Sequence, residues 1–261
     1  MIYVRKYGKP PYQVAVVHGG PGAPGSMAPV ARELAKRCGV IEHIESARTV
    51  DGQIDELRDA LREHAALPVT LVGHSWGAWL SIFFAARYPA MAKKLILVGS
   101  APFEERYAAQ ITATRLSRMS DDERHQLAVL SEALGRPDGN KAALFTLFGA
   151  LLAKADTYDP APPGDEGDAM EFRENVYQDA WLEGQALRRS GELLARARQV
   201  RCPVVAIHGD YDSHPAEGVE KPLGDAIPGF RFIRLEKCGH EPWRERAARD
   251  RFYDILISEL G

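Results

Sequence analysis

Short runs of β-branched and aliphatic residues alternate with longer segments of helical periodicity through the first hundred residues and again after residue 200. This alternation is typical of strand–helix–strand units, which build a parallel sheet with helices on both faces. The run 14–17 is continuously apolar, which predicts a strand that is buried on both faces. The predicted strands cover 14–17, 40–44, 69–72, 94–98, 204–207 and 230–235, and an alternating run at 2–7 predicts an edge strand.

The segments between these runs have the ends that helices require. The Ser26 side chain is available as the N-cap of the first helix. A later helix has to stop before Pro89, because the proline ring blocks its continuation. The predicted helices cover 26–38, 51–64, 75–88 and 242–260.

The strand pattern stops after residue 100 and returns just after residue 200. The stretch between is predicted to be helical, with breaks at clusters of turn residues over 135–140 and 159–164. We therefore predict an α/β fold with a mostly parallel central sheet flanked by helices. Residues 1–100 and 200–261 are expected to form the core, and residues 101–199 a helical cap inserted between two strands.

The composition limits the classes of function. A formal net charge of −3, with Lys and Arg scattered among Asp and Glu, argues against nucleic acid or an anionic membrane as a partner. No apolar run approaches the roughly 18–20 residues of a membrane span, and we expect no secretory signal. The three cysteines, Cys38, Cys202 and Cys238, lack metal-binding spacing and predict reduced thiols in a cytoplasmic protein. We expect neither a metal nor another cofactor, and the composition leaves the oligomeric state open.

The pentapeptide Gly73-His74-Ser75-Trp76-Gly77 connects the predicted strand 69–72 to a helix. A G-x-S-x-G sequence at such a junction forms a strained turn that exposes the serine oxygen. A serine hydroxyl is a weak nucleophile at neutral pH and needs a base, which a third group must orient. Ser75 is therefore the predicted nucleophile.

The segment His18-Gly19-Gly20-Pro21-Gly22 follows the strand 14–17 and precedes a helix. A loop in this position can donate a backbone N–H to the oxyanion of a tetrahedral intermediate, together with the N–H of the residue after the nucleophile. We assign these two donors to Gly20, because a glycine lets the backbone approach closely, and to Trp76.

The acid is expected in the loop after the strand 204–207, where Asp210 and Asp212 are two residues apart. We favour Asp212, because the chain must pass Gly209 before a side chain can turn back toward the base. Asp210 is expected to cap the turn instead.

The base is expected in the loop after the strand 230–235, and His240 is the histidine there. His214 is a rival base, but it lies so close to Asp212 in sequence that it is poorly placed to bridge that carboxylate to Ser75.

The order Ser75, Asp212, His240 is that of the α/β-hydrolases. The sequence resembles this superfamily from about Tyr12 to Leu260. Its His18–Gly22 loop and Ser75-Trp76-Gly77 elbow are similar to those of the proline iminopeptidase branch. The resemblance implies an α/β-hydrolase fold and removal of an N-terminal residue from a peptide. It also implies a triad of Ser75, Asp212 and His240, with Gly20 and Trp76 as oxyanion donors. The elbow begins Gly73-His74, however, a form common in esterases, whereas that branch usually has Gly-Gly or Gly-Gln.

Glu171 and Glu174 are three residues apart and share one face of a predicted cap helix. They are candidates to hold a substrate ammonium, as acidic cap groups do in the branch that the sequence resembles. The alternative is a solvated helix start, where acidic residues favour the positive end of the helix dipole.

The predicted function is a serine hydrolase that cleaves an ester or amide bond of a small molecule or short peptide through an acyl-enzyme. An aminopeptidase, a carboxylesterase and a thioesterase all remain open. A non-hydrolytic relative, either a lyase or a ligand receptor, is the alternative from another class, because this fold hosts both with intact triads.

Overall fold

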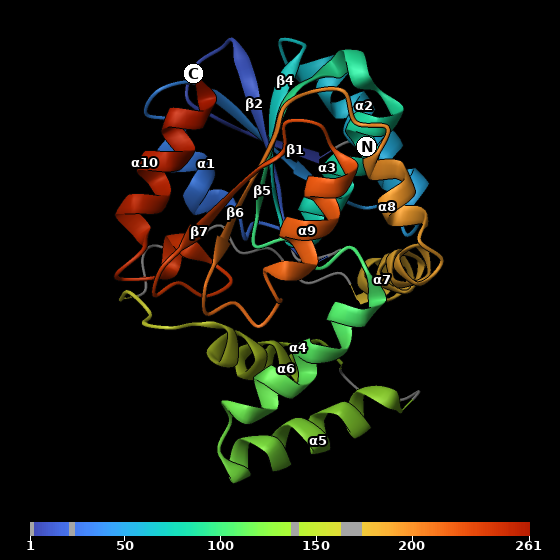
Figure 1. Cartoon of the computed structure of the whole chain (residues 1–261), viewed down its shortest axis with the longest axis vertical. Helices are drawn as coiled ribbons and strands as arrows, with labels where there is room; N and C mark the ends of the chain where they lie inside the picture. The colour runs from blue at the N-terminus through green and yellow to red at the C-terminus, as the bar shows by residue number, and fades with distance from the viewer. Residues whose placement is uncertain (1–2, 21–23, 137–140, 163–173) are drawn as a thin grey trace.

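The computed structural model describes residues 3–20, 24–136, 141–162 and 174–261. In these residues seven strands form one sheet in the order β1-β3-β2-β4-β5-β6-β7 (Figure 1). β1 runs antiparallel to β3 at one edge, and every other neighbouring pair is parallel. The predicted α/β fold with a mostly parallel sheet is confirmed. The strands are β1 Tyr3–Tyr7, β2 Tyr12–Val17, β3 Gly39–Ile44, β4 Val69–His74, β5 Ala92–Val98, β6 Val204–Gly209 and β7 Arg231–Leu235.

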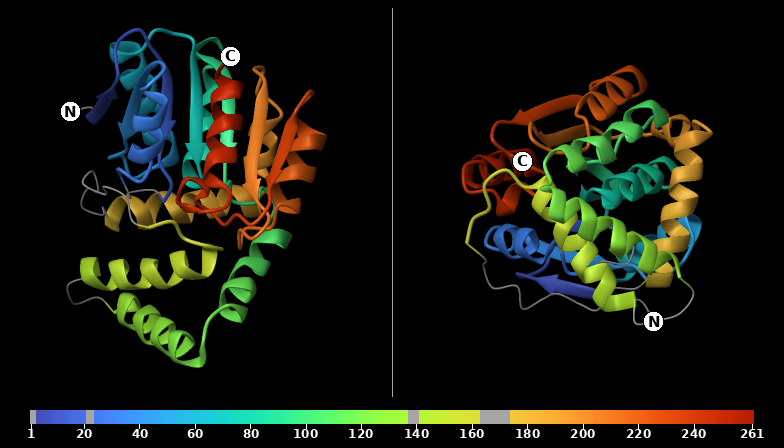
Figure 2. Two further views of the ribbon diagram at one scale, coloured as in Figure 1. Left: turned by 90° about the vertical axis from the view of Figure 1, so that its left-hand side faces the viewer. Right: turned by 90° about the horizontal axis from the view of Figure 1, so that it is seen from below.

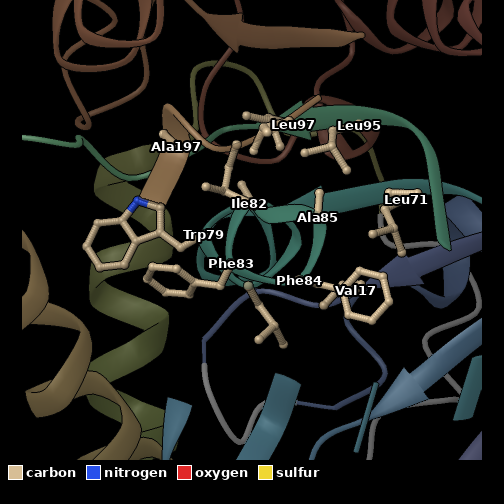
Figure 3. Packing of buried hydrophobic residues seen from close by; sticks show 14 of the residues in the cluster. Val17, Leu71, Trp79, Ile82, Phe83, Phe84, Ala85, Leu95, Leu97 and Ala197 are labelled. Atoms are coloured by element: carbon tan, nitrogen blue, oxygen red, sulfur yellow. The ribbon is translucent and has the colours of Figure 1, made fainter. Parts of the chain in front are cut away.

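Helices cover both faces of the sheet, so β4 and β6 are buried along their whole length. One face packs against α1 (Ala28–Leu34) and α10 (Arg249–Leu260). The other packs against α2 (Val50–His64), α3 (Trp76–Arg87), α8 (Glu192–Ala197) and α9 (Glu217–Ala226). Figure 3 shows Ile82 of α3 within this second layer next to Leu97 of β5, with Phe83 near Trp79.

Helix α1 begins at Ala28, later than expected, and its N-cap is Met27 without a side-chain hydrogen bond. The prediction of Ser26 as the N-cap is therefore wrong. The Ala28 N–H donates to the Gly25 carbonyl (3.1 Å), so a turn comes before the helix. Pro29 lies in the first helical turn, where a missing N–H costs nothing.

Between β5 and β6 the described residues form helices and add no strand to the sheet. Figure 2 shows α7 lying across the end of the sheet, with α6 and α5 beyond it. Helix α8 returns to the sheet and packs against α3. None of the described helices combines the length and the apolarity that a membrane span requires. The inserted helices are α4 Glu105–Ser117, α5 Asp121–Gly135, α6 Lys141–Asp156, α7 Glu174–Arg189 and α8.

The carboxyl ends of the parallel strands meet at the edge of the sheet that these helices cover. Loops at this edge are where open α/β sheets hold their ligands. Ser75 follows β4, the loop 18–20 follows β2, Asp212 follows β6 and His240 follows β7.

Candidate active site

Ser75 joins β4 to α3 with a backbone φ of 51° and ψ of −111°. A positive φ is uncommon for a residue with a side chain and costs on the order of 1–3 kcal/mol, so the surroundings must hold it. The Ser75 N–H donates to the carbonyl of Val98 at the end of β5 (3.0 Å). A Cβ on Gly73 would overlap the carbonyl oxygen of Gly77, and one on Gly77 would overlap that of Val17. The turn therefore requires both glycines of the pentapeptide.

The loop after β2 passes directly over Ser75. A Cβ added to Gly19 would clash with the His74 ring and lie 3.2 Å from the Ser75 Cβ. Gly20 has a φ of 56°, a conformation that glycine adopts without strain. Trp76 is the first residue of α3, where a backbone N–H has no partner within the helix. The two expected oxyanion donors thus belong to segments that meet at Ser75.

Asp212 is buried and uses both carboxylate oxygens. Oδ2 accepts a hydrogen bond from Nδ1 of His240 (2.8 Å). Oδ1 accepts from Nδ1 of His214 (2.8 Å) and from the His214 backbone N–H (2.9 Å). Burial alone would raise the pKa of Asp212, but the neighbouring imidazoles and these hydrogen bonds hold that pKa well below its usual range. Asp210 instead accepts from the backbone N–H of Cys238 (3.2 Å), so of the two candidate acids Asp212 is the one that faces the histidines.

His240 lies against the end of β4 and β5. Its carbonyl accepts a hydrogen bond from Nε2 of His74 (3.2 Å), and the two rings are 4.7 Å apart. A Cβ on Gly99, next to Val98, would press against the His240 carbonyl and ring. Burial opposes protonation of His240, but the Asp212 charge and hydrogen bond outweigh it and raise the pKa of His240. The raised pKa is suited to accepting a proton from a hydroxyl.

His214 stacks on His240 with ring centroids 4.4 Å apart and planes 24° apart. Sequence reasoning considered it only as a rival base. The structure instead brings it to the opposite oxygen of the carboxylate that holds His240. The signal in the sequence was the spacing Asp-x-His, which lets a side chain and its own N–H return to one carboxylate.

The loop that holds His240 is fastened to the end of α6. The His240 N–H donates to the carbonyl of Asp156 (2.9 Å). Glu245, also buried, accepts from the backbone N–H groups of Gly239 (2.8 Å), Tyr158 (2.9 Å) and Asp159 (2.8 Å). The inserted helices and His240 therefore share one hydrogen-bonded junction.

The two acidic candidates for substrate binding have different outcomes. Glu171 lies outside the described residues. Glu174 begins α7, accepts from Gln178 (3.0 Å) and pairs with Lys141 of α6 (3.4 Å). A cation from the protein therefore already faces the Glu174 carboxylate.

Aromatic rings connect α7 to the elbow helix. Trp181 stacks on Trp79 (6.1 Å, 9°), and Tyr177 stacks on Trp181 (6.2 Å, 11°). A Cβ on Gly184 would press against the Trp76 ring, so α7 sits directly on the start of α3. The Trp76 ring itself is buried and donates from Nε1 to Gln53 (2.9 Å).

Among the described residues, Asp212, His214 and His240 are the one grouping whose ligand atoms lie close enough for a metal ion, within 4.8 Å of one another. Nδ1 of both imidazoles is at hydrogen-bond distance from the carboxylate.

A crevice of about 540 Å³ lies between α1, α10 and the end of α6 with the segment after it. Glu241 and Trp243, which follow His240 in the chain, are part of its wall.

Comparison with known proteins assigns the chain to a family. The profile of the alpha/beta hydrolase family matches residues 14–254, nearly the whole chain. The chain belongs to the alpha/beta hydrolase family. The superfamily predicted from the elbow and the order of the later loops is thus confirmed.

Two curated relatives of this alpha/beta hydrolase are pimeloyl-[acyl-carrier protein] methyl ester esterases. That of Aromatoleum aromaticum is 26% identical over 199 residues, 71% of this chain and 72% of the relative. That of Chromobacterium violaceum is 24% identical over 251 residues, 93% of this chain and 92% of the relative. These relatives do not point to the proline iminopeptidase branch, which stays a prediction.

Solved structures share the fold. The crystal structure of VinJ has a TM-score of 0.72 at 18% identity, over 99% of this chain and 94% of that one. A structure from work on carboxylesterases of Nitrososphaera gargenis has a TM-score of 0.65 at 19% identity, over 99% and 93%. At these sequence identities the similarity indicates a shared fold and nothing about function.

Proposed function

We propose that this alpha/beta hydrolase is a serine esterase that cleaves small acyl esters through an acyl-enzyme. Ser75 is the nucleophile, His240 the base, Asp212 the acid, and the N–H groups of Gly20 and Trp76 are the oxyanion donors. The observation that carries this proposal is the 2.8 Å hydrogen bond from His240 to Asp212, at the sheet edge that also holds Ser75.

In this mechanism Nε2 of His240 takes the Ser75 proton while Nδ1–H stays on Asp212, which stabilises the imidazolium. The serine oxygen attacks the ester carbonyl, and the two backbone N–H groups receive the negative charge of the oxyanion. The imidazolium then gives its proton to the leaving alcohol. In the second half a water, deprotonated by His240, attacks the acyl carbonyl. The imidazolium then returns this proton to the Ser75 oxygen as the bond from that oxygen to the acyl carbon breaks and the acid leaves.

An ester is favoured over an amide because both curated relatives are named as methyl ester esterases. The pairing of Glu174 with Lys141 also reduces the negative charge that an aminopeptidase would offer to a substrate ammonium. In this proposal residues 101–199 form the cap, as expected from the sequence, and its last helix, α8, packs against α3 of the core. The unpaired thiols of Cys38, Cys202 and Cys238 fit a cytoplasmic location.

Fluorophosphonate labelling followed by an ester panel tests the proposal. We expect the native protein to be labelled, to hydrolyse p-nitrophenyl acyl esters and to leave prolyl-arylamide intact. Ser75→Ala should abolish both labelling and hydrolysis. Absence of labelling in the folded native protein would refute the serine mechanism, and release of the arylamine without ester hydrolysis would assign a peptidase.

The two aspartates of one loop provide a matched pair. Asp212→Asn should reduce kcat by about 10⁴-fold, because an amide does not hold the imidazole in the required tautomer. Asp210→Asn keeps an oxygen toward the Cys238 N–H and should stay within a few-fold of the native enzyme. Equal losses in both variants would contradict the assignment of the acid.

A further inference from the structure

The Asp212 carboxylate accepts hydrogen bonds from two imidazoles, while the mechanism needs one. A third imidazole, that of His208, has Nε2 3.5 Å from Oδ2 but donates to the His214 carbonyl. His240 occupies Oδ2, and His214 occupies Oδ1 through its ring Nδ1 and its backbone N–H. All three side chains are largely buried, so these hydrogen bonds form in a site with little water to compete for the carboxylate.

The side-chain bond of His214 is not required to shape the loop. The backbone N–H of His214 already closes the turn onto Asp212, as in turns that Asp commonly forms. The His214 carbonyl is held separately, by Nε2 of the buried His208 (2.8 Å). The ring Nδ1–H is thus a second donor to an oxygen that the turn has already satisfied once.

A second donor matters because the terminal torsion of an aspartate is soft. Rotation about χ2 is broad and roughly two-fold, so a carboxylate with one firm partner can swing out of plane at small cost. With Oδ1 fixed from two directions, the carboxylate plane is set and Oδ2 points at Nδ1 of His240. The His214 ring also stacks on the His240 ring at 4.4 Å, which leaves that ring little room to tilt on this side.

We propose that His214 is a positioning residue for the hydrolytic site: its ring fixes the Asp212 carboxylate plane and backs the His240 ring. This role rests on the proposed function, since it concerns the acid and base of that mechanism. His214 itself takes no proton from Ser75. It acts through Asp212 and by stacking on His240.

Two substitutions separate hydrogen bonding from the filling of space. In His214→Asn the amide nitrogen stands at the same number of bonds from the backbone as Nδ1, so the donor to Oδ1 is retained. His214→Leu fills similar volume and has no donor. Both variants keep the backbone N–H that closes the turn, and urea unfolding of each reports whether the fold is retained.

Ester hydrolysis is the first measurement. We expect His214→Leu to lower kcat about 10- to 100-fold with little change in KM, the loss typical of a misplaced catalytic group. His214→Asn should stay within about five-fold of the native enzyme. Equal losses in the two variants, or a native-like kcat in His214→Leu, would overturn the proposal.

Proton NMR of the resting enzyme is the second measurement, and it does not depend on catalysis. Both variants lack the ring N–H of His214. The resonance of the Nδ1 proton of His240 is then distinguished from those of the ring N–H groups of His74 and His208 by its change in Asp212→Asn. This resonance should persist in His214→Asn and broaden or move upfield in His214→Leu. An unchanged resonance in His214→Leu would refute the role of His214 even if the protein hydrolyses no ester. Absence of labelling and hydrolysis in the native protein would instead refute the proposed function.

Discussion

Replacing the buried Glu245 carboxylate should loosen the loop that presents His240. Its two oxygens accept three backbone N–H groups: Oε1 from Gly239 and Tyr158, and Oε2 from Asp159. In Glu245→Gln the amide oxygen can take the place of Oε1 and accept from Gly239 and Tyr158. The amide NH₂ then takes the place of Oε2 and faces the Asp159 N–H, so two donors oppose each other. A hydrogen bond to a charged group contributes about 1.5–3 kcal/mol, so the free energy of unfolding should fall by that amount.

Urea unfolding measures this loss, and Glu236→Gln is the control, because Glu236 is exposed on the same loop and the change in charge is identical. We expect the control to remain within about 0.5 kcal/mol of the native protein. The kcat of Glu245→Gln should also fall, because Gly239 adjoins His240. If the free energies of unfolding of the two variants differ by less than about 0.5 kcal/mol, the hydrogen bonds of Glu245 do not stabilise the loop that presents His240.

Three further outcomes follow from the geometry. Because only the neutral imidazole accepts the Ser75 proton and the pKa of His240 is raised above 6.5, kcat/KM should rise with pH to a half-maximum above pH 6.5; a midpoint near 5 would contradict this reasoning. Burial, and next the proximity of His18, lower the pKa of His43 to about 3, so between pH 6.5 and 3 the unfolded chain binds a proton that the native chain does not. The free energy of unfolding should therefore fall as pH falls through this window, by up to about 1.4 kcal/mol per pH unit, and His43→Leu should flatten the slope in urea titrations. Gly77→Ala forces a methyl group against the Val17 carbonyl and should cost about 1–3 kcal/mol in thermal unfolding, whereas Gly135→Ala, in open space, should be nearly neutral; similar losses would count against the tight elbow.

The sheet could be predicted because strands that are buried on both faces can have continuous runs of apolar residues, as 14–17 in β2 and 204–207 in β6 do. The G-x-S-x-G motif and the order of the later loops along the chain are why Ser75, Asp212 and His240 could be proposed together. The Asp-x-His spacing allows the contact between His214 and Asp212, but the stacking of His214 on His240 could not be predicted, because spacing along a chain gives the length of a loop but not the direction in which it turns.

The inserted helices were harder for a related reason. Helix α6 is apolar on nearly every side, so its sequence does not reveal which side faces the core. The stacking of Trp181 on Trp79 depends on how α7 crosses the elbow helix, and no local pattern encodes that crossing.

The direct pairing of β6 with β5 sets the order in which the sheet can fold. The two strands are neighbours in the sheet although all of α4–α8 is made between them, so their contact closes a long loop and is slow to form. During synthesis the Ser75 elbow emerges first, while β5 still has an open edge and neither Asp212 nor His240 exists. A chain that ends before β6 therefore lacks the proposed acid and base, and its exposed β5 edge is prone to edge-to-edge association. When β6 pairs with β5 and β7 pairs with β6, the open edge of β5 is covered and the loops that carry Asp212 and His240 are put in place.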